Sequence, residues 1–184
     1  MKYWTFLIFF LQSTMAMASD LSERLSGFST IEASSGNFVE TWRADYLDEP
    51  LISKGELRYK RPGQLRKLIT EPTRIEQHIE DGQLSVIHNG KTNSIPLSEQ
   101  PELAAGIYAL QAVLDGDEEK LQKLFVLKYS DSNDNWNLTL TPKDKQVADS
   151  IESIIMQGNG NRIQRVAIRF YNGDNLLTEI THGD

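Results

Sequence analysis

The 184-residue chain contains no cysteine and only three histidines. Without a thiol it can form no disulfide, thiolate zinc site, iron–sulfur cluster or nucleophilic cysteine. No two of its histidines, His78, His88 and His182, have the i, i+4 spacing that places two imidazole ligands on one face of a helix. The sequence therefore predicts neither a metal centre nor a cofactor.

Basic residues are scarce as well, because 19 Lys and Arg are set against 26 Asp and Glu, for a net charge of −7 and a pI near 5.0. Nucleic-acid binding depends mainly on neutralising phosphates with Lys and Arg, so we expect no nucleic-acid partner. The chain also has no nucleophile elbow and no phosphate-binding glycine loop. We therefore expect a protein that is not an enzyme.

The chain has no apolar run of the length that a membrane-spanning helix needs, roughly 20 residues. The N-terminal run from Tyr3 to Leu11 follows Lys2 and precedes Ala16-Met17-Ala18, which has the small-x-small pattern of a cleavage site. We expect residues 1–18 to be a cleaved secretory signal peptide, with a retained anchor as the alternative. Residues 19–184 are then a single exported domain, with no internal repeat or linker.

The spacing of apolar residues predicts helices in two regions. Residues 20–30 carry apolar side chains at three- and four-residue steps, as expected of a short amphipathic helix (Leu21, Leu25 and Phe28). A second stripe of this kind, ending at Gly116, predicts a longer helix (Leu103, Ile107, Leu110 and Leu114). A short helix capped by Asp117 follows it.

Elsewhere the pattern has the period of two that is typical of half-buried strands. Asp81-Gly82 and Asn89-Gly90 are hairpin turn signals. We expect about ten or eleven strands, over residues 37–42, 51–60, 65–70, 74–80, 83–87, 92–95, 125–129, 136–142, 151–156, 163–171 and 176–181.

Short connections between these strands favour an antiparallel sheet. The predicted fold class is mainly β (α+β): an unclosed, strongly curved antiparallel half-barrel, with a helical lid over a hydrophobic cavity. Such a concave apolar space suits an acyl-type ligand. The apolar stripes of the helices fit a dry core equally well.

Arg61 has an unusual position, because strand alternation places it on the same side as Leu57 and Tyr59. An arginine on an apolar side needs carbonyls, a carboxylate or an anionic ligand, since it does not lose its charge. Glu40, between Phe38 and Trp42, is one possible partner. Alternatively, the strand ends before Arg61 and the guanidinium reaches solvent.

Basic residues also cluster between positions 54 and 67, which is unusual in an acidic chain (Lys54, Arg58, Lys60, Arg61, Arg66 and Lys67). Such a cluster could dock an acidic partner or lipid headgroups. The alternative is a solvated hairpin face.

Four stretches, in this order along most of the chain, resemble the periplasmic outer-membrane lipoprotein carriers of the LolA type. The most specific is the second, and the stretches are Gly36-Asn37-Phe38, Gly55-Glu56-Leu57-Arg58-Tyr59-Lys60-Arg61-Pro62-Gly63-Gln64-Leu65-Arg66, Ile79-Glu80-Asp81-Gly82-Gln83-Leu84 and Leu138-Thr139-Leu140-Thr141-Pro142-Lys143. Two features depart from the family pattern. Leu65 and Lys67 replace its common aromatics, and the chain stops without the extra C-terminal segment of the best-known carriers.

The resemblance implies an unclosed barrel that carries acylated lipoproteins, or another acylated lipid, from an inner-membrane transporter to an outer-membrane receptor. It implies no chemistry, a periplasmic location and a monomer. Arg61 would be the lid latch, an arginine that hydrogen-bonds lid carbonyls and keeps the empty cavity shut. The candidate lipid-binding residues are Phe38, Trp42, Leu57, Tyr59, Leu65, Ile107 and Leu110. Two alternatives stay open, namely a non-shuttling lipoprotein sensor on the same fold and an enzyme that acts on lipid.

Overall fold

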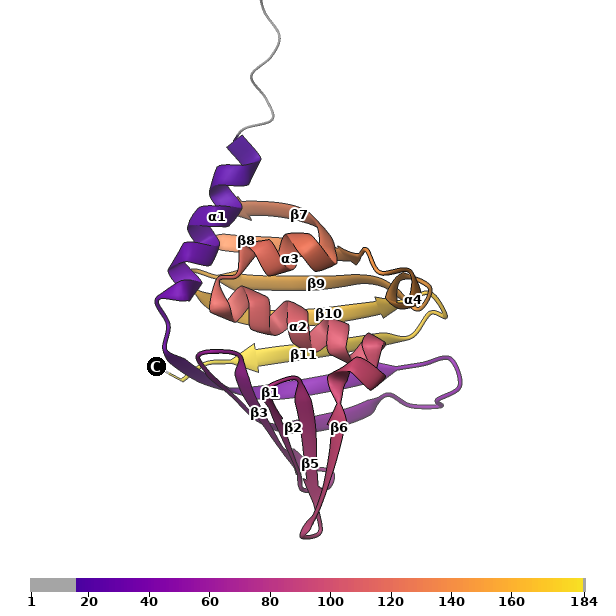
Figure 1. The fold of residues 1–184 in the computed structure, drawn as a ribbon. Coiled ribbons are helices and arrows are strands. Elements are labelled where there is room, and N and C mark those ends of the chain that lie inside the picture. The colour runs from indigo at the N-terminus through magenta and orange to yellow at the C-terminus, as the bar shows by residue number, and fades with distance from the viewer. Residues whose placement is uncertain (1–15, 184) are drawn as a thin grey trace, which may run out of the picture.

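Eleven antiparallel strands form one continuous sheet in the computed structural model, which describes residues 16–183 (Figure 1). The strands are β1 (Ala33–Arg43), β2 (Leu51–Lys60), β3 (Gln64–Glu71), β4 (Ile75–Glu80), β5 (Gln83–His88), β6 (Lys91–Pro96), β7 (Phe125–Ser132), β8 (Asn135–Pro142), β9 (Ile151–Asn159), β10 (Arg162–Phe170) and β11 (Asn175–Thr181). The helices are α1 (Ala16–Ser29), α2 (Pro101–Asp115), α3 (Glu118–Leu124), α4 (Lys145–Ala148) and the 3₁₀ turn η1 (Leu97–Glu99).

The strand order is β6-β5-β4-β3-β2-β1-β11-β10-β9-β8-β7. Two meanders, β1 to β6 and β7 to β11, therefore meet where β1 pairs with β11, from Asn37 opposite Thr181 to Arg43 opposite Asn175. The sheet does not close, because β6 and β7 lie at its two edges. The predicted half-barrel and the predicted number of strands are confirmed, whereas the pairing of β1 with β11 was not predicted.

The hairpin turns lie where the sequence predicts them. At Asp81-Gly82 and Asn89-Gly90 both residues have positive φ, between 50° and 72°. Two consecutive positive φ values define the turn that matches the twist of antiparallel strands, and Asn, Asp and Gly adopt them most readily. The local turn chemistry thus fixes the register of β4, β5 and β6.

The helices differ from the prediction at their ends. Helix α1 begins at Ala16 rather than near residue 20, so the predicted cleavage site after Ala18 falls within it, and residues 1–15 of the predicted signal lie outside the described residues. The single-turn helix α4 was not predicted, although the Asp144 carboxylate caps it by accepting the Val147 N–H at 3.2 Å. In residues 16–183, no helix has both the length and the apolar character needed to cross a membrane.

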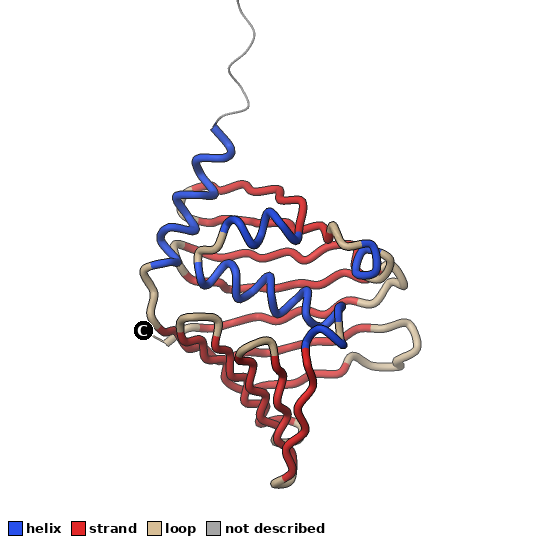
Figure 2. The backbone as a smooth tube through the Cα atoms, in the orientation of Figure 1, coloured by secondary structure: helices blue, strands red, loops and turns tan. Residues whose placement is uncertain are grey.

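Helices α1, α2 and α3 lie over one face of the sheet (Figure 2). Ala109 and Ala112 of α2 are fully buried, as are Leu140 and Ile154 on the strands. Phe28 of α1 meets Trp136 edge to face, with ring centroids 5.7 Å apart. Small alanines let α2 approach its neighbours closely, and this face of α2 packs into the core.

Candidate functional site

A cavity of about 450 Å³ lies between α2 and the inner face of the sheet, within the size range of natural ligand pockets. Its wall comes from β1 to β5, β10 and β11, and its roof comes from α2. Because the two meanders meet at β1 and β11, residues from both ends of the chain share this wall.

Six of the seven residues predicted to bind lipid line this cavity, namely Phe38, Trp42, Leu57, Leu65, Ile107 and Leu110. Phe38 and Leu65 are each 2% exposed and form its floor. Trp42 is half-buried and packs against Phe170, with ring centroids 5.4 Å apart. The seventh residue, Tyr59, does not line it and belongs to a neighbouring cavity.

Helix α2 presents two different apolar faces. The alanine face is buried in the core, while Leu103 is 47% exposed and Ile107 and Leu110 are half-buried. Three of the four residues of the predicted stripe therefore line the cavity, whereas the fourth, Leu114, is buried in the core. Apolar surface left accessible in a concave site is what an apolar ligand would cover.

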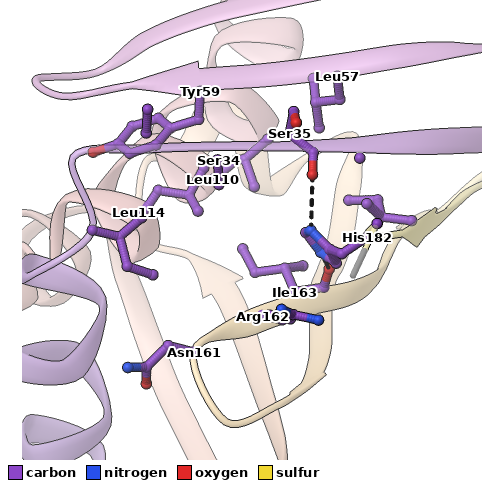
Figure 3. Close-up of a pocket in the computed structure, with 15 residues that line it drawn as sticks. Ser34, Ser35, Leu57, Tyr59, Leu110, Leu114, Asn161, Arg162, Ile163 and His182 are labelled. Atoms are coloured by element: carbon purple, nitrogen blue, oxygen red, sulfur yellow. Dashed lines mark hydrogen bonds between the residues drawn. The ribbon is translucent and has the colours of Figure 1, made fainter.

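A second cavity, of about 280 Å³ (Figure 3), lies beside the first and shares Leu57, Leu110 and Ile180 with it. His182 borders it, with Nδ1 3.2 Å from the Ser35 carbonyl oxygen and Nε2 2.7 Å from that of Ile163. The ring thus links the end of β11 to β1 and β10, a structural position that the sequence did not predict.

Arg61 lies in the turn directly after β2, and its half-buried guanidinium binds backbone carbonyls. It donates to Asp115 O at 2.9 Å and to Leu114 O at 3.1 Å, both at the end of α2. It also donates to Phe28 O at 3.1 Å, in the last turn of α1, and to Ile31 O at 3.3 Å, just beyond that helix. A cation placed at two helix C-termini satisfies carbonyls that lack helical partners and complements both helix dipoles.

Asp115 ties the same end of α2 to the hairpin between β2 and β3. Its Oδ1 accepts the Tyr59 hydroxyl at 2.6 Å and the Gly63 N–H at 3.1 Å. The Gln111 side chain donates to the Gly63 carbonyl beside it. Burial raises the pKa of Tyr59, and the hydrogen bond to Asp115 raises it further. This network was not predicted, although an acidic residue in the last turn of a helix is an unusual signal.

The sequence allowed Glu40 as a partner of Arg61, but the structure does not pair these two residues. Glu40 pairs with Lys67 of β3, whose Nζ lies 2.6 Å from Oε1 and 2.7 Å from Oε2. Lys67 reaches Glu40 because both side chains point into the large cavity, whereas Arg61 lies past the end of β2.

The basic cluster of residues 54–67 is divided in the structure between the exposed surface of β2 and β3 and the interior. Lys54 pairs with Glu71 at 3.2 Å and Arg58 with Glu56 at 2.6 Å. Arg61 and Lys67 face the interior, whereas the other four cations are exposed, and Arg58 lies directly opposite Arg66 across β2 and β3. Docking of an acidic partner or lipid headgroups on these exposed cations stays a prediction, as does the alternative of a solvated hairpin face. Across residues 16–183, no group of three or more His, Asp or Glu side chains has a geometry that could hold a metal ion.

The sequence matches the family model described as outer membrane lipoprotein carrier protein LolA-like over residues 13–182. No curated protein matches it. Among solved structures it is similar to a LolA superfamily protein from Nitrosomonas europaea (12% identity, 90% of this chain and 92% of that one, TM-score 0.49).

It is also similar to MucB (18% identity, TM-score 0.50), with 92% of this chain covering 58% of that one. A third similar structure is the lipoprotein LppX of Mycobacterium tuberculosis (10% identity, 89% and 94% covered, TM-score 0.43). At these identities the similarity concerns the fold.

Proposed function

Because the chain belongs to the LolA-like outer membrane lipoprotein carrier family, we propose that it is a periplasmic carrier of acylated cargo. The acyl chains of a lipoprotein, or of another acylated lipid, occupy the cavity under α2. The protein carries them from the inner to the outer membrane. It acts without chemistry, as a carrier rather than an enzyme.

The observation that carries this proposal is the cavity of about 450 Å³ roofed by the half-exposed stripe of α2. Each methylene moved from water into such a space contributes about 0.8 kcal/mol. An acyl chain entering the cavity covers Leu103, Ile107 and Leu110, which the empty protein leaves partly accessible.

Arg61 has the geometry of a latch for this cavity. Its four carbonyl contacts hold the ends of α1 and α2 together, and α2 is the roof. For α2 to move aside, the contacts to Leu114 and Asp115 must break. A few kcal/mol of such contacts is outweighed when several methylenes are buried, so the latch favours the closed form only while the cavity is empty.

We include in the proposal the removal of residues 1–18 on export, a monomeric mature protein, an inner-membrane transporter that loads it and an outer-membrane receptor that unloads it. The acidic pI near 5.0 supports release from anionic membrane surfaces, because negative charge opposes binding there.

The test is native mass spectrometry with lipid extraction on mature protein purified gently from its own periplasm. A co-purifying acylated species of defined mass is the expected result and identifies the cargo. An empty protein that also fails to take up a triacylated lipopeptide would overturn the proposal. A stable complex with one envelope protein that persists without lipid would instead favour the sensor alternative.

A cavity-filling variant supplies the matched comparison. A Cβ at Gly106 of α2 would lie 3.0 Å from Cδ1 of Ile168 across the cavity, so Gly106→Leu places its side chain in the space proposed for the acyl chain. Lys123→Leu adds an apolar side chain at an exposed position of α3, away from the cavity. We expect Gly106→Leu to reduce lipopeptide uptake and Lys123→Leu to leave it unchanged.

A further inference from the structure

One ion pair lies in the mostly apolar wall of the large cavity. Glu40 of β1 and Lys67 of β3 are 17% and 18% exposed and make two short contacts, at 2.6 and 2.7 Å. The Thr178 hydroxyl of β11 donates to Oε2 of Glu40 at 2.9 Å. Gln77 of β4 adds an amide to the same wall.

Folding stability does not account for this pair. Removing two charges from water costs several kcal/mol for each ion, and apolar residues of similar size are often as good or better at such a position. The surrounding wall, with Phe38, Leu65 and Ile79, is built from those apolar residues. A polar pair retained in such a wall therefore points to recognition of a polar group in the ligand.

The hydrogen bonds of Lys67 leave one donor over. An ammonium group has three N–H donors. Among the described residues, the Lys67 ammonium donates only to the two carboxylate oxygens of Glu40. The Nζ also lies 4.8 Å from the centroid of the Phe38 ring, close to the apolar floor. The third N–H is thus available to an acceptor that enters the cavity.

Charge balance selects the kind of acceptor. The pair is neutral as a whole, so a carboxylate or phosphate entering beside Lys67 would also meet the carboxylate of Glu40. Two anions that share one cation repel each other. An ester or amide carbonyl accepts the spare N–H without adding charge, and these are the groups that join acyl chains to lipids and lipoproteins.

We propose that the Glu40–Lys67 pair binds the ester or amide carbonyl at the head of an acyl chain, so that the cavity accepts linked acyl chains and rejects free fatty acids. Lys67 is the hydrogen-bond donor, and Glu40 excludes anionic head groups. This selectivity rests on the proposed acyl-binding function of the cavity and adds a rule for its cargo.

The test compares two ligands of equal chain length, monopalmitoylglycerol and palmitate, at pH 7.5. Each competes with a polarity-sensitive fluorescent probe bound to the purified protein. We expect the ester to bind at least tenfold more tightly than the fatty-acid anion. Glu40→Gln removes the excluding charge and should tighten palmitate binding at least tenfold, while the ester changes little.

A double variant is used in place of Lys67→Met alone, because the single substitution leaves the Glu40 carboxylate without its cation and destabilises the fold. The double variant Glu40→Gln/Lys67→Met removes both charges of the pair and its spare donor, with Glu102 of α2 unchanged in the lining, and should bind the ester less tightly than the unaltered protein does. Equal binding of ester and palmitate by the unaltered protein, or no response of palmitate to Glu40→Gln, would overturn the selectivity alone. If neither ligand nor hexadecanol displaces the probe, the proposed acyl-binding function fails instead.

Discussion

The hydroxyl of Tyr59 donates a 2.6 Å hydrogen bond to Asp115, which joins the end of strand β2 to the last residue of helix α2. The same carboxylate accepts the N–H of Gly63, so one side chain connects the roof of the cavity to the hairpin that carries Arg61. Two predictions concern this contact.

The ionisation of Tyr59 should make the protein less stable in alkali. Burial and Asp115 raise its pKa above the ordinary value of 10.0, so the unfolded chain loses this proton first. Its contribution to stability is complete below pH 10 and declines as the pH rises toward the folded-state pKa. Denaturant unfolding of the unaltered protein and of Tyr59→Phe between pH 8 and 11 measures this. Above pH 10, Tyr59→Phe should lose less unfolding free energy than the unaltered protein does. Some loss remains, because burial also raises the pKa of Tyr129.

Removing the carboxylate of Asp115 should loosen the roof. Asp115→Ala leaves the Tyr59 hydroxyl and the Gly63 N–H without their acceptor, and we expect a loss of about 1–3 kcal/mol in unfolding free energy. Asp149→Ala is the control, because the Asp149 carboxylate forms an exposed pair with Lys145 at 2.8 Å. Such pairs contribute about 0.3–0.5 kcal/mol. Equal losses in the two variants, measured in urea, would remove the assigned role of Asp115.

Replacing Arg61 should make the cavity easier to load. Arg61→Leu removes the four carbonyl contacts of the closed form, so the ligand no longer has to break them. We expect a folded but less stable protein, with tighter lipopeptide binding and slower release in a fluorescence displacement assay. Arg66→Leu, at an exposed position of β3, should behave as the unaltered protein does. Unchanged affinity and release in Arg61→Leu would rule out a latch at this position.

The end of α2 should not tolerate a side chain at Gly116. Its φ is +68°, and a Cβ there would lie 2.5 Å from the Leu25 carbonyl oxygen of α1 and 2.8 Å from Cβ of Ser29. Gly116→Ala combines about 1–2 kcal/mol of backbone strain with overpacking of roughly 1–3 kcal/mol. Gly160→Ala has the strain without the overpacking, since its φ is +52° and the space around it is open. The melting temperatures of the two variants separate these effects, and similar shifts would mean that α1 and α2 can move apart here.

Much of the fold could be predicted because its signals are local. The turn at Asn89-Gly90 and the capping of α3 by Asp117 each depend on residues within a few positions of one another. Strand alternation also correctly placed Phe38 and Trp42 on the cavity side of β1. The match of six predicted lining residues to one cavity follows from this, because residues on one face of a curved sheet converge.

The rest could not be predicted because it depends on which strands become neighbours. Alternation places Glu40 and Lys67 on the inner face but does not show that they meet across β2. Tyr59 shares a face with Leu57, yet its hydroxyl bonds to Asp115 at the end of α2, and its side chain lines the second cavity. The family resemblance implied that Arg61 binds lid carbonyls, but which carbonyls it reaches depends on where α1 and α2 end in space.

The pairing of β1 with β11 bears on the order in which the molecule assembles. The remaining strand pairs join elements adjacent along the chain, while the Glu40–Thr178 hydrogen bond spans 138 positions. Closing so large a loop is entropically costly, and contacts of this kind slow folding. We expect the two meanders to form early and β1 to pair with β11 afterwards. The wall of the cavity crosses that seam, so the binding-competent state arises only in the final step of folding.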